Sequence, residues 1–310
     1  MSSTPLTLLL TVPMPDFVRT QLEQRFEVLS ITDAALPADQ AQRVQVVLTN
    51  GSRGLSAAEM QALPALRLVS AMGAGHENID HEYARQHGIA VTHGGGANAD
   101  IVADHAMALL GAAVRRIPVM DRLARAGCDR DALPSDPGLH GRKLGLVGAG
   151  HIGRCLAKRA SGYDMDIAYH SRNPVPDWAP RYVDNLPELA EWADYLIVAV
   201  PGGAATLHMI DSRILAALGP QGYLVNVGRG SVVDTQALAT ALRDNLIAGA
   251  GLDVYEGEPG PPSELVGFDN LVLTPHIAGR SDSAWAGQAT LFLRNVEERL
   301  AGRPGVNSVV

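Results

Sequence analysis

Short apolar runs alternate with helix-like segments along the first third of the chain. Residues 15–26 carry apolar side chains at helical spacing, and residues 56–63 begin at a serine that can cap a helix. Both segments are expected to be helices. Strands are expected at residues 6–11, 26–31, 44–49, 66–70 and 89–92. This alternation predicts a parallel sheet with crossover helices.

A long segment rich in Ala, Leu and Met, from Asp100 to about Arg125, predicts a single helix. A loop rich in Pro, Gly and Asp follows at residues 127–138, and then the alternation begins again. Further strands are expected at residues 143–147, 166–170, 195–200, 223–227, 248–253 and 271–273. Further helices are expected at residues 153–161, 187–192, 210–218, 236–244 and 283–300. The chain therefore contains a second α/β unit.

Two glycine-containing segments bracket this second unit. Gly94-Gly95-Gly96 follows the last strand of the first unit, and Ala278-Gly279 follows the last strand of the second. Glycine accepts backbone conformations that other residues resist, which suits a hinge. We therefore expect residues 1–96 and 281–310 to form one domain, with residues 97–280 inserted as a second domain.

Composition narrows the class of protein. The 310 residues, of which 46% are hydrophobic and 19% charged, indicate a sizeable core. A net charge of −8 without a Lys/Arg cluster argues against nucleic acids and anionic membranes as partners, although a local pocket can still bind an anion.

Cys128 and Cys155 form no ligand pattern, which predicts reduced thiols and no metal site. The apolar stretch at 6–12 is too short for a membrane span, so we expect a cytoplasmic protein.

The segment Gly148-Ala149-Gly150-His151-Ile152-Gly153 matches a dinucleotide-binding fingerprint. The pattern alone is weak in a chain with 32 glycines, but a strand precedes it and a helix rich in Ala and Leu follows. Gly148 would make the tight turn, Gly150 would admit a pyrophosphate, and Gly153 would let helix and strand pack closely. The helix N-terminus would supply N–H donors to the phosphates. The alternative is a glycine-rich turn without a ligand.

The next strand bears on the choice of cofactor. The fingerprint calls for an acidic residue about 20 positions on, which would bind the ribose 2′-hydroxyl of NAD. Here the only acidic residue of the strand at 166–170 is Asp166 at its start. The C-terminal end of the strand, where the carboxylate is expected, is followed by Ser171 and Arg172. A hydroxyl and a guanidinium suit a 2′-phosphate. We therefore predict a preference for NADPH, with NAD as the second cofactor. The alternative is that Arg172 is a solvated loop residue.

Three polar residues follow strands of the second unit. Arg229 comes after the strand at 223–227, Glu258 after that at 248–253, and His276 after that at 271–273. The carboxyl ends of parallel strands share one edge, where open α/β sheets bind ligands. Arginine can polarise a 2-oxo acid, histidine can protonate the carbonyl oxygen as hydride arrives, and a carboxylate can orient the imidazole.

Each of the three has a plainer interpretation. Arg229, between two glycines, could be a loop cation, and Glu258, before a proline, could be a solvated turn residue with Glu256 as a competing carboxylate. A lone histidine such as His276 is more often structural. The three together, on the edge that the fingerprint selects, favour a reductase site.

These motifs resemble those of the D-isomer-specific 2-hydroxyacid dehydrogenases, in particular the glyoxylate/hydroxypyruvate reductase branch. The motifs are AMGAGHENID at 71–80, LVGAGHIG at 146–153, VNVGRG at 225–230, GLDVYEGEP at 251–259 and TPHI at 274–277, so the resemblance covers nearly the whole chain. It implies an α/β fold of two Rossmann-like, doubly wound parallel-sheet domains with the active site in the cleft between them. It also implies a homodimer built on the cofactor domain.

The resemblance implies individual roles as well. Residues 1–96 and 281–310 would bind the substrate, and residues 97–280 would bind NAD(P). Arg229 matches the substrate-binding arginine, His276 the general acid/base and Glu258 its partner. The backbone amides of Ala74 and Gly75 match the donors that hold the substrate carboxylate. The cofactor would lie along Gly148, Gly150, His151, Ile152, Gly153, Ser171, Arg172, Val200, Pro201, Val227, Gly228, Asp253, His276 and Gly279, with Asp253 on the nicotinamide carboxamide.

The implied reaction is reduction of a small 2-oxo acid, such as glyoxylate or hydroxypyruvate, to the D-2-hydroxy acid. The chain departs from the family at Pro201-Gly202-Gly203-Ala204, where Pro-Leu-Thr-Pro is usual, and at Arg280. Arg280 is a further candidate for substrate contact, and the alternative is that it is an exposed residue at the start of a helix. Arg53 is another candidate for substrate contact.

Two rival functions remain open at this point. One is a formate-oxidising enzyme, against which Glu258 argues because that branch dispenses with the carboxylate. The other is a non-enzymatic NAD(P)-sensing binding protein of the same fold, against which the lack of a basic run argues.

Overall fold

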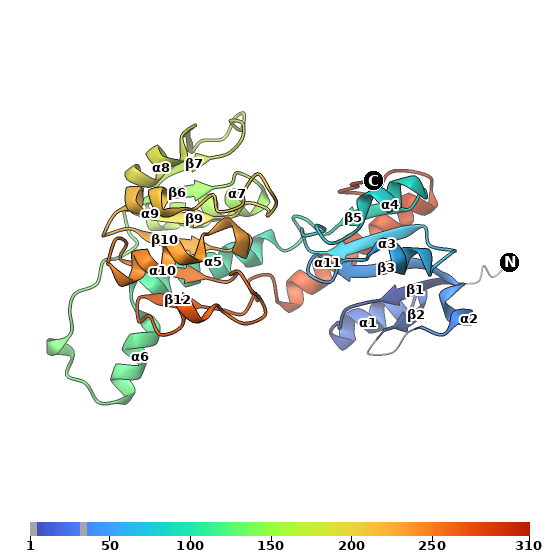
Figure 1. Ribbon diagram of the computed structural model, residues 1–310, viewed down its shortest axis with the longest axis horizontal. Helices are drawn as coiled ribbons and strands as arrows, with labels where there is room; N and C mark the ends of the chain where they lie inside the picture. The colour runs from blue at the N-terminus through green and yellow to red at the C-terminus, as the bar shows by residue number, and fades with distance from the viewer. Residues whose placement is uncertain (1–4, 32–35) are drawn as a thin grey trace. The chain divides into compact units, whose positions relative to one another are not determined.

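The computed structural model describes residues 5–31 and 36–310. The chain divides into two compact units, one of residues 1–98 with 280–310 and the other of residues 99–279. Each unit is built on a parallel sheet with helices packed on its faces (Figure 1), which confirms the α/β prediction. Because parallel strands need crossover connections, the alternation of strands and helices in the sequence leads directly to this architecture.

The first unit contains a five-stranded sheet in the order β2-β1-β3-β4-β5, with every pair parallel. Its strands are β1 Leu6–Leu10, β2 Phe26–Ser30, β3 Val44–Asn50, β4 Leu68–Met72 and β5 Ala90–His93. Its helices are α1 Asp16–Glu23, α2 Ala38–Ala41, α3 Ala57–Gln61, α4 His81–Gln86 and α11 Asp282–Leu300. The C-terminal helix α11 thus completes a unit that begins at the N-terminus.

Apolar side chains explain why α11 belongs to the first unit. Phe292, Leu293 and Val296 of this helix are buried in one core with Leu8 of β1 and Leu48 of β3. The C-terminal tail then extends the sheet, because Val309 N–H donates to Val91 O at 2.8 Å and Ser308 forms an antiparallel bridge with Thr92. Burial of apolar surface therefore joins segments from the two ends of the sequence.

The second unit contains a seven-stranded parallel sheet in the order β12-β11-β10-β9-β6-β7-β8. Its strands are β6 Lys143–Val147, β7 Asp166–His170, β8 Arg181–Tyr182, β9 Tyr195–Val198, β10 Tyr223–Asn226, β11 Gly249–Leu252 and β12 Leu271–Leu273. Its α-helices are α5 Ala99–Val114, α6 Ile117–Arg125, α7 His151–Ala160, α8 Leu186–Trp192, α9 Ser212–Leu218 and α10 Thr235–Arg243. Helices α8, α9 and α10 cover one face, and α5 and α7 cover the other.

The strand order places a topological switch point at β6. From β6 the chain proceeds outward through β7 and β8, and then returns to β9 on the other side of β6. The loops after β6 and β9 consequently leave the same sheet edge in opposite directions. A crevice forms outside the carboxyl ends of strands at such a point, and doubly wound sheets bind ligands there.

The expected single helix from Asp100 to Arg125 is wrong. The structure has two helices, with α5 ending at Val114 and α6 beginning at Ile117. Between them Arg116 adopts the left-handed region at φ 49°, and Pro118 lies in the first turn of α6. Proline within a helix removes a hydrogen bond and clashes with the preceding turn, but it is tolerated at the start of a new helix.

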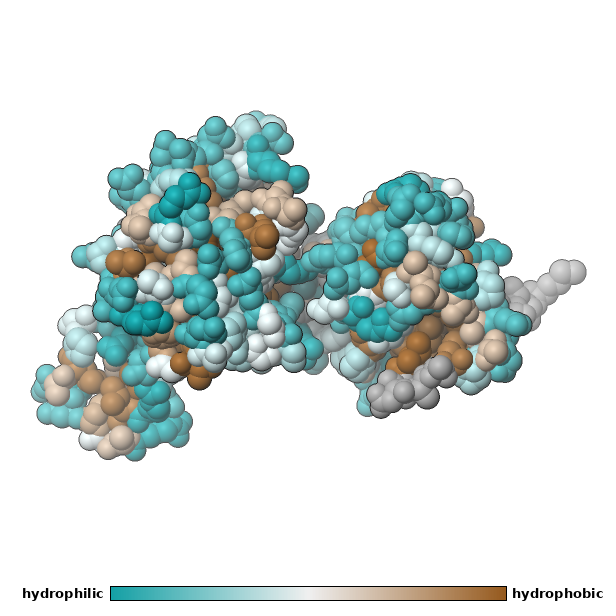
Figure 2. Space-filling model, viewed as in Figure 1, coloured by the Kyte–Doolittle hydropathy of each residue, from teal (hydrophilic) through white to brown (hydrophobic). Residues whose placement is uncertain are grey.

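The segment around α6 projects from the sheet of its own unit (Figure 1). Its surface carries apolar side chains (Figure 2), and Ile117 at its start is 54% exposed. Among the described residues, no helix has the length and apolar character needed to cross a membrane.

Candidate active site

The glycine fingerprint forms the turn between β6 and α7. Gly148 has φ 111°, and a Cβ there would lie 2.7 Å from Ala199 O, at the end of β9. A Cβ on Gly153 would lie 2.2 Å from Gly148 O. Both positions therefore exclude any side chain, because either contact is far shorter than a van der Waals separation.

Gly150 differs from its two neighbours in the fingerprint. It occupies the N-cap position of α7, makes no side-chain capping bond, and a Cβ there would meet nothing within 4 Å. The open space faces a helix N-terminus whose first N–H groups lack intrahelical partners. His151 and Ile152 form the first turn of this helix. This geometry fits a pyrophosphate held on backbone amides.

Ser171 and Arg172 follow β7 directly, at the same sheet edge. The Ser171 hydroxyl donates to Asn173 O at 2.6 Å, and the Tyr182 hydroxyl donates to Ser171 O at 3.2 Å. The Arg172 side chain is exposed. The turn after β7 thus presents a hydroxyl and a guanidinium where a carboxylate would be needed to bind a ribose 2′-hydroxyl.

The loops after β9 and β10 meet at the carboxyl edge of the sheet. Val200 and Pro201 follow β9, while Val227 and Gly228 follow β10. A Cβ on Gly228 would lie 2.5 Å from Val200 O, so the two loops touch through their backbones. In the unusual loop after Pro201, the Thr206 hydroxyl donates to Pro201 O at 2.7 Å.

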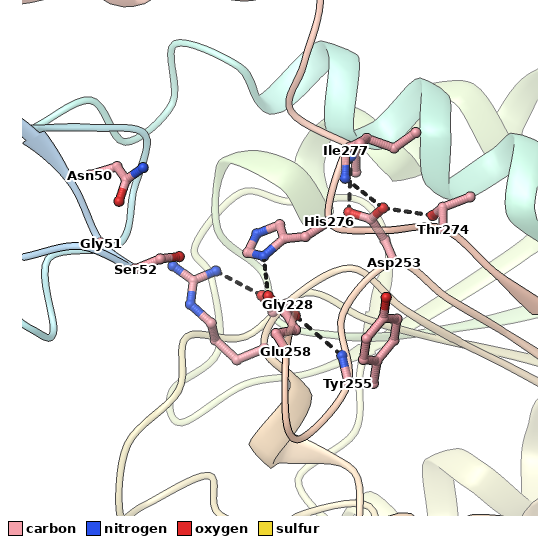
Figure 3. A network of polar contacts seen from close by, with 12 residues as sticks. Asn50, Gly51, Ser52, Gly228, Asp253, Tyr255, Glu258, Thr274, His276 and Ile277 are labelled. Atoms are coloured by element: carbon pink, nitrogen blue, oxygen red, sulfur yellow. Dashed lines mark hydrogen bonds and ion pairs between the residues drawn. The ribbon is translucent and has the colours of Figure 1, made fainter. Parts of the chain in front are cut away.

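His276 and Glu258 are in direct polar contact. Nδ1 of His276 lies 2.7 Å from Oε2 of Glu258 (Figure 3). The Tyr255 N–H donates to the other Glu258 oxygen at 3.3 Å, which helps to orient the carboxylate. His276 follows β12 and Glu258 follows β11, and these strands are neighbours in the sheet. A histidine held in this way by a carboxylate can act as a general acid/base.

Glu256, the competing carboxylate, has other partners. Its Oε2 accepts from the Thr235 hydroxyl at 2.6 Å, and its Oε1 lies 2.9 Å from Nε2 of His208. The hydrogen bond with Glu256 raises the pKa of His208. Glu256 therefore ties the loop after β11 to the loop before α9, while Glu258 contacts His276.

Arg229 lies in a loop that Asn226 holds in shape. Asn226 is fully buried, its Oδ1 accepts from Gly228 N–H at 3.0 Å, and its Nδ2 donates to Arg229 O at 2.9 Å. The guanidinium donates from Nη1 to Gly228 O at 2.8 Å. A Cβ on Gly230 would lie 2.1 Å from the Tyr255 carbonyl carbon, so this loop packs against the one that carries Glu258.

Asp253 is 1% exposed and anchors the segment around His276. Its Oδ1 accepts from the Thr274 hydroxyl at 2.6 Å and from Ile277 N–H at 2.9 Å (Figure 3). Its Oδ2 accepts from Ala278 N–H at 2.9 Å. Oδ2 can accept a further hydrogen bond, such as one from a carboxamide. Gly279 follows this segment and ends the unit.

The loop after β4 carries Ala74 and Gly75 in the first unit. A Cβ on Gly51 would lie 2.8 Å from the Gly75 Cα, so the loop after β3 packs directly on this segment. Three histidines support the same loop: the His76 ring stacks on His93 at 5.0 Å, and its Nδ1 lies 3.2 Å from Nε2 of His81. Burial, together with neighbouring His76, lowers the pKa of His81.

The two arginines named as further candidates differ in their surroundings. Arg53 forms an ion pair with Glu59, whose pKa the hydrogen bond from Arg53 lowers to about 2. Arg280 is exposed and directly precedes Ser281, the N-cap of α11. Arg53 is therefore engaged with α3 of its own unit.

Known proteins match this chain over nearly its full length. A model of the D-isomer specific 2-hydroxyacid dehydrogenase NAD binding domain matches residues 107–278. The chain belongs to the D-isomer specific 2-hydroxyacid dehydrogenase family. A hydroxyphenylpyruvate reductase of Plectranthus scutellarioides is 34% identical over 307 residues, which are 97% of this chain and 98% of the relative. A 2-ketogluconate reductase of Gluconobacter oxydans is 36% identical over 297 residues, 96% of each chain.

A solved structure of this D-2-hydroxyacid dehydrogenase family agrees closely in fold. The NADPH-dependent glyoxylate/hydroxypyruvate reductase of Sinorhizobium meliloti, in complex with citrate, aligns with a TM-score of 0.89 at 36% identity, covering 99% of this chain and 98% of that one. The chain is therefore an oxidoreductase, which confirms the activity class predicted from its motifs. The NAD binding domain match lies wholly within the second unit.

Sequence reasoning missed several residues that shape this site. Asn226 and Thr274 stand inside recognised motifs, but their hydrogen bonds to the Arg229 loop and to Asp253 were not anticipated. His105 of α5, with Nε2 2.9 Å from the Thr274 hydroxyl, gave no signal at all because it lies within an apolar helical segment.

Substitution of Gly150 tests whether a pyrophosphate lies against it. Because a Cβ at this position meets no protein atom, Gly150→Ala should leave the thermal midpoint unchanged. It should raise the Kd for NADPH about tenfold or more, since the methyl group occupies the space of the phosphates. Fluorescence titration of NADPH measures the effect. Gly162→Ala, at another open glycine of the same unit, is the matched control, and equal affinity of the two variants would contradict the assignment.

Proposed function

We propose that this chain reduces a small 2-oxo acid of the glyoxylate or hydroxypyruvate type to the D-2-hydroxy acid, with NADPH preferred and NADH as the second reductant. The 2.7 Å pair of His276 Nδ1 and Glu258 Oε2 carries the proposal. A proton donor is needed wherever hydride is added to a carbonyl carbon, and a carboxylate-bound imidazole meets that need. The related glyoxylate/hydroxypyruvate reductase from Sinorhizobium meliloti supports the substrate class.

The roles that we propose for individual groups are those expected from the sequence motifs. NADPH, when bound along the fingerprint, supplies the hydride. Nδ1 of His276 is engaged by Glu258, so Nε2 is the atom that gives its proton to the carbonyl oxygen. Arg229 polarises that carbonyl, and the amides of Ala74 and Gly75 hold the substrate carboxylate. Asp253 would bind the nicotinamide carboxamide of the cofactor, because its Oδ2 can accept one further hydrogen bond.

The preference for NADPH rests on Ser171 and Arg172. Arginine offers charged donors in a fork that matches phosphate oxygens, whereas the turn lacks the carboxylate that would favour the free ribose. The glyoxylate/hydroxypyruvate reductase from Sinorhizobium meliloti is also NADPH-dependent. Both observations support a 2′-phosphate subsite after β7.

A panel of 2-oxo acids assayed with both cofactors tests the reaction and the cofactor together. We expect NADPH oxidation with glyoxylate and hydroxypyruvate, and a kcat/KM for NADPH at least about tenfold above that for NADH, as loss of a charged hydrogen bond to phosphate would imply. Arg172→Ala should shrink this ratio. An NADH preference would contradict the cofactor assignment, and absence of turnover on every acid would favour the NAD(P)-sensing binding protein.

Substitutions of His276 and Glu258 test the acid/base assignment. His276→Ala should lower kcat by about 10²–10⁴, the usual effect of losing a general acid. Glu258→Gln removes the charge beside the imidazole and should lower kcat about tenfold. The matched control is Glu256→Gln, which changes a carboxylate of the same loop that contacts Thr235 and His208 instead. Steady-state kinetics at saturating NADPH measure all three, and equal losses in Glu256→Gln and Glu258→Gln would reject the pair.

We also propose a cytoplasmic homodimer that uses the projecting segment around α6. The apolar surface of this segment and the 54% exposure of Ile117 support an interface between two copies. The two cysteines are both unpaired, as expected in a reducing compartment. Light scattering after gel filtration should give the mass of a dimer, and Ile117→Asp should shift it toward the monomer; a monomeric wild-type chain would refute the dimer.

A further inference from the structure

The segment that carries His276 has a backbone conformation that needs support. His276 adopts φ 54°, in the left-handed region that residues other than glycine occupy at an energetic cost. Its N–H donates to Asp253 O at 2.8 Å and contacts Thr274 O at 3.0 Å. Such strained residues persist only where neighbouring groups determine their position, so the contacts around residues 274–278 bear on where the imidazole points.

One carboxylate supports most of this segment. Asp253 accepts from the Thr274 hydroxyl, from Ile277 N–H and from Ala278 N–H. These donors lie before and after His276 in the sequence, so Asp253 fixes the backbone on both sides of the strained residue. The Asp253 side chain is 1% exposed, and its oxygens are therefore shielded from competing water.

A second residue, His105 of α5, reaches the same network. Its Nε2 lies 2.9 Å from the Thr274 Oγ1 and 3.5 Å from the Asp253 Oδ1. The Thr274 hydroxyl has one proton, and it donates that proton to the carboxylate, which can only accept. The hydroxyl must therefore accept from His105, whose Nε2 carries a hydrogen. The donors run in one direction, from His105 through Thr274 to Asp253.

Helix α5 gives this chain of donors a fixed origin. The helix extends over 16 residues, and Val102, Ala103, Ala106, Leu109 and Leu110 are buried in the core beneath the sheet. The His105 side chain is only 22% exposed, so its ring has little freedom to leave Thr274. Hydrogen bonds aligned in one direction polarise one another and strengthen the whole chain.

We infer that His105 is a positioning residue for the reductase reaction, acting through Thr274 and Asp253 to hold the His276 segment. The inference rests on the proposed function, because it concerns the group that donates the proton. We assign His105 no direct contact with substrate or cofactor. Loss of His105 would remove the hydrogen bond that the Thr274 hydroxyl accepts and would thereby loosen residues 274–278.

Four single variants separate the hydrogen bond from simple packing. His105→Phe keeps a ring but removes the donor, whereas His105→Gln places an N–H near the Nε2 position. Thr274→Val removes the hydroxyl, whereas Thr274→Ser keeps it. We expect His105→Phe and Thr274→Val to lower kcat about tenfold, the effect of leaving a buried polar group unpaired, and the Gln and Ser variants to stay within about threefold of the wild type. The Kd for NADPH should change less than about threefold in all four.

The double variant His105→Phe/Thr274→Val tests whether the two residues act as one unit. If they do, its kcat equals that of Thr274→Val alone, because the chain of donors is already broken. His140→Phe, at a histidine that is 81% exposed and pairs with Asp164 on the surface, is the matched control and should match the wild type. Additive losses in the double variant would overturn the inference, and so would equal losses in His105→Phe and His105→Gln.

Amide hydrogen exchange supplies a measurement that needs no turnover. His105→Phe should speed the exchange of the Ile277 and Ala278 amides about tenfold, because their acceptor Asp253 becomes less firmly held, and His105→Gln should not. Unchanged exchange in His105→Phe overturns the inference even if the wild type reduces 2-oxo acids. Faster exchange in a chain without any turnover on 2-oxo acids would instead support the positioning role and refute the proposed function.

Discussion

The parallel direction of the seven strands in the second unit is the constraint on which the site depends. Parallel strands deliver all of their carboxyl ends to one edge, so the loops after β6, β7, β9, β10, β11 and β12 leave the sheet on the same side. The fingerprint, the Ser171-Arg172 turn, Arg229, Glu258 and His276 all lie in these loops. These residues span more than 120 positions of the sequence. The parallel sheet brings them to one edge even where they do not contact one another.

Within that edge, short backbone contacts determine which loops touch. Gly148, Gly153, Gly228 and Gly230 each lie so close to another backbone that a side chain would collide with it. Because the loops pack closely, neighbouring side chains of one loop can contact different partners. Glu256 and Glu258 stand two residues apart, but the first binds Thr235 and His208 while the second binds His276. Burial of the Asp253 carboxylate without partners would cost free energy of folding, and hydrogen bonds from three donors in residues 274–278 offset that cost.

Particular residues show how far the sequence could predict this structure. The strands and the glycine turn follow from apolar periodicity and from a motif with local physical reasons, and the α/β class is confirmed. The helix expected over Asp100–Arg125 failed because its composition favours helix throughout, whereas Pro118 ends one helix and starts another. His105 could not be found, since its partner Thr274 is 169 residues away and nothing local distinguishes a polar residue that reaches such a partner from one that is solvated.

The sequence by itself determined the class of fold, the family and the identity of the candidate residues, because periodicity, turn chemistry and short motifs act through near neighbours in the chain. Only the tertiary structure decided which carboxylate pairs with His276, that Asn226 shapes the Arg229 loop, and that Asp253, Thr274 and His105 form one network behind the imidazole. Hydrogen bonds require atoms to approach within about 3 Å, and such distances between remote segments depend on how the sheet and helices pack.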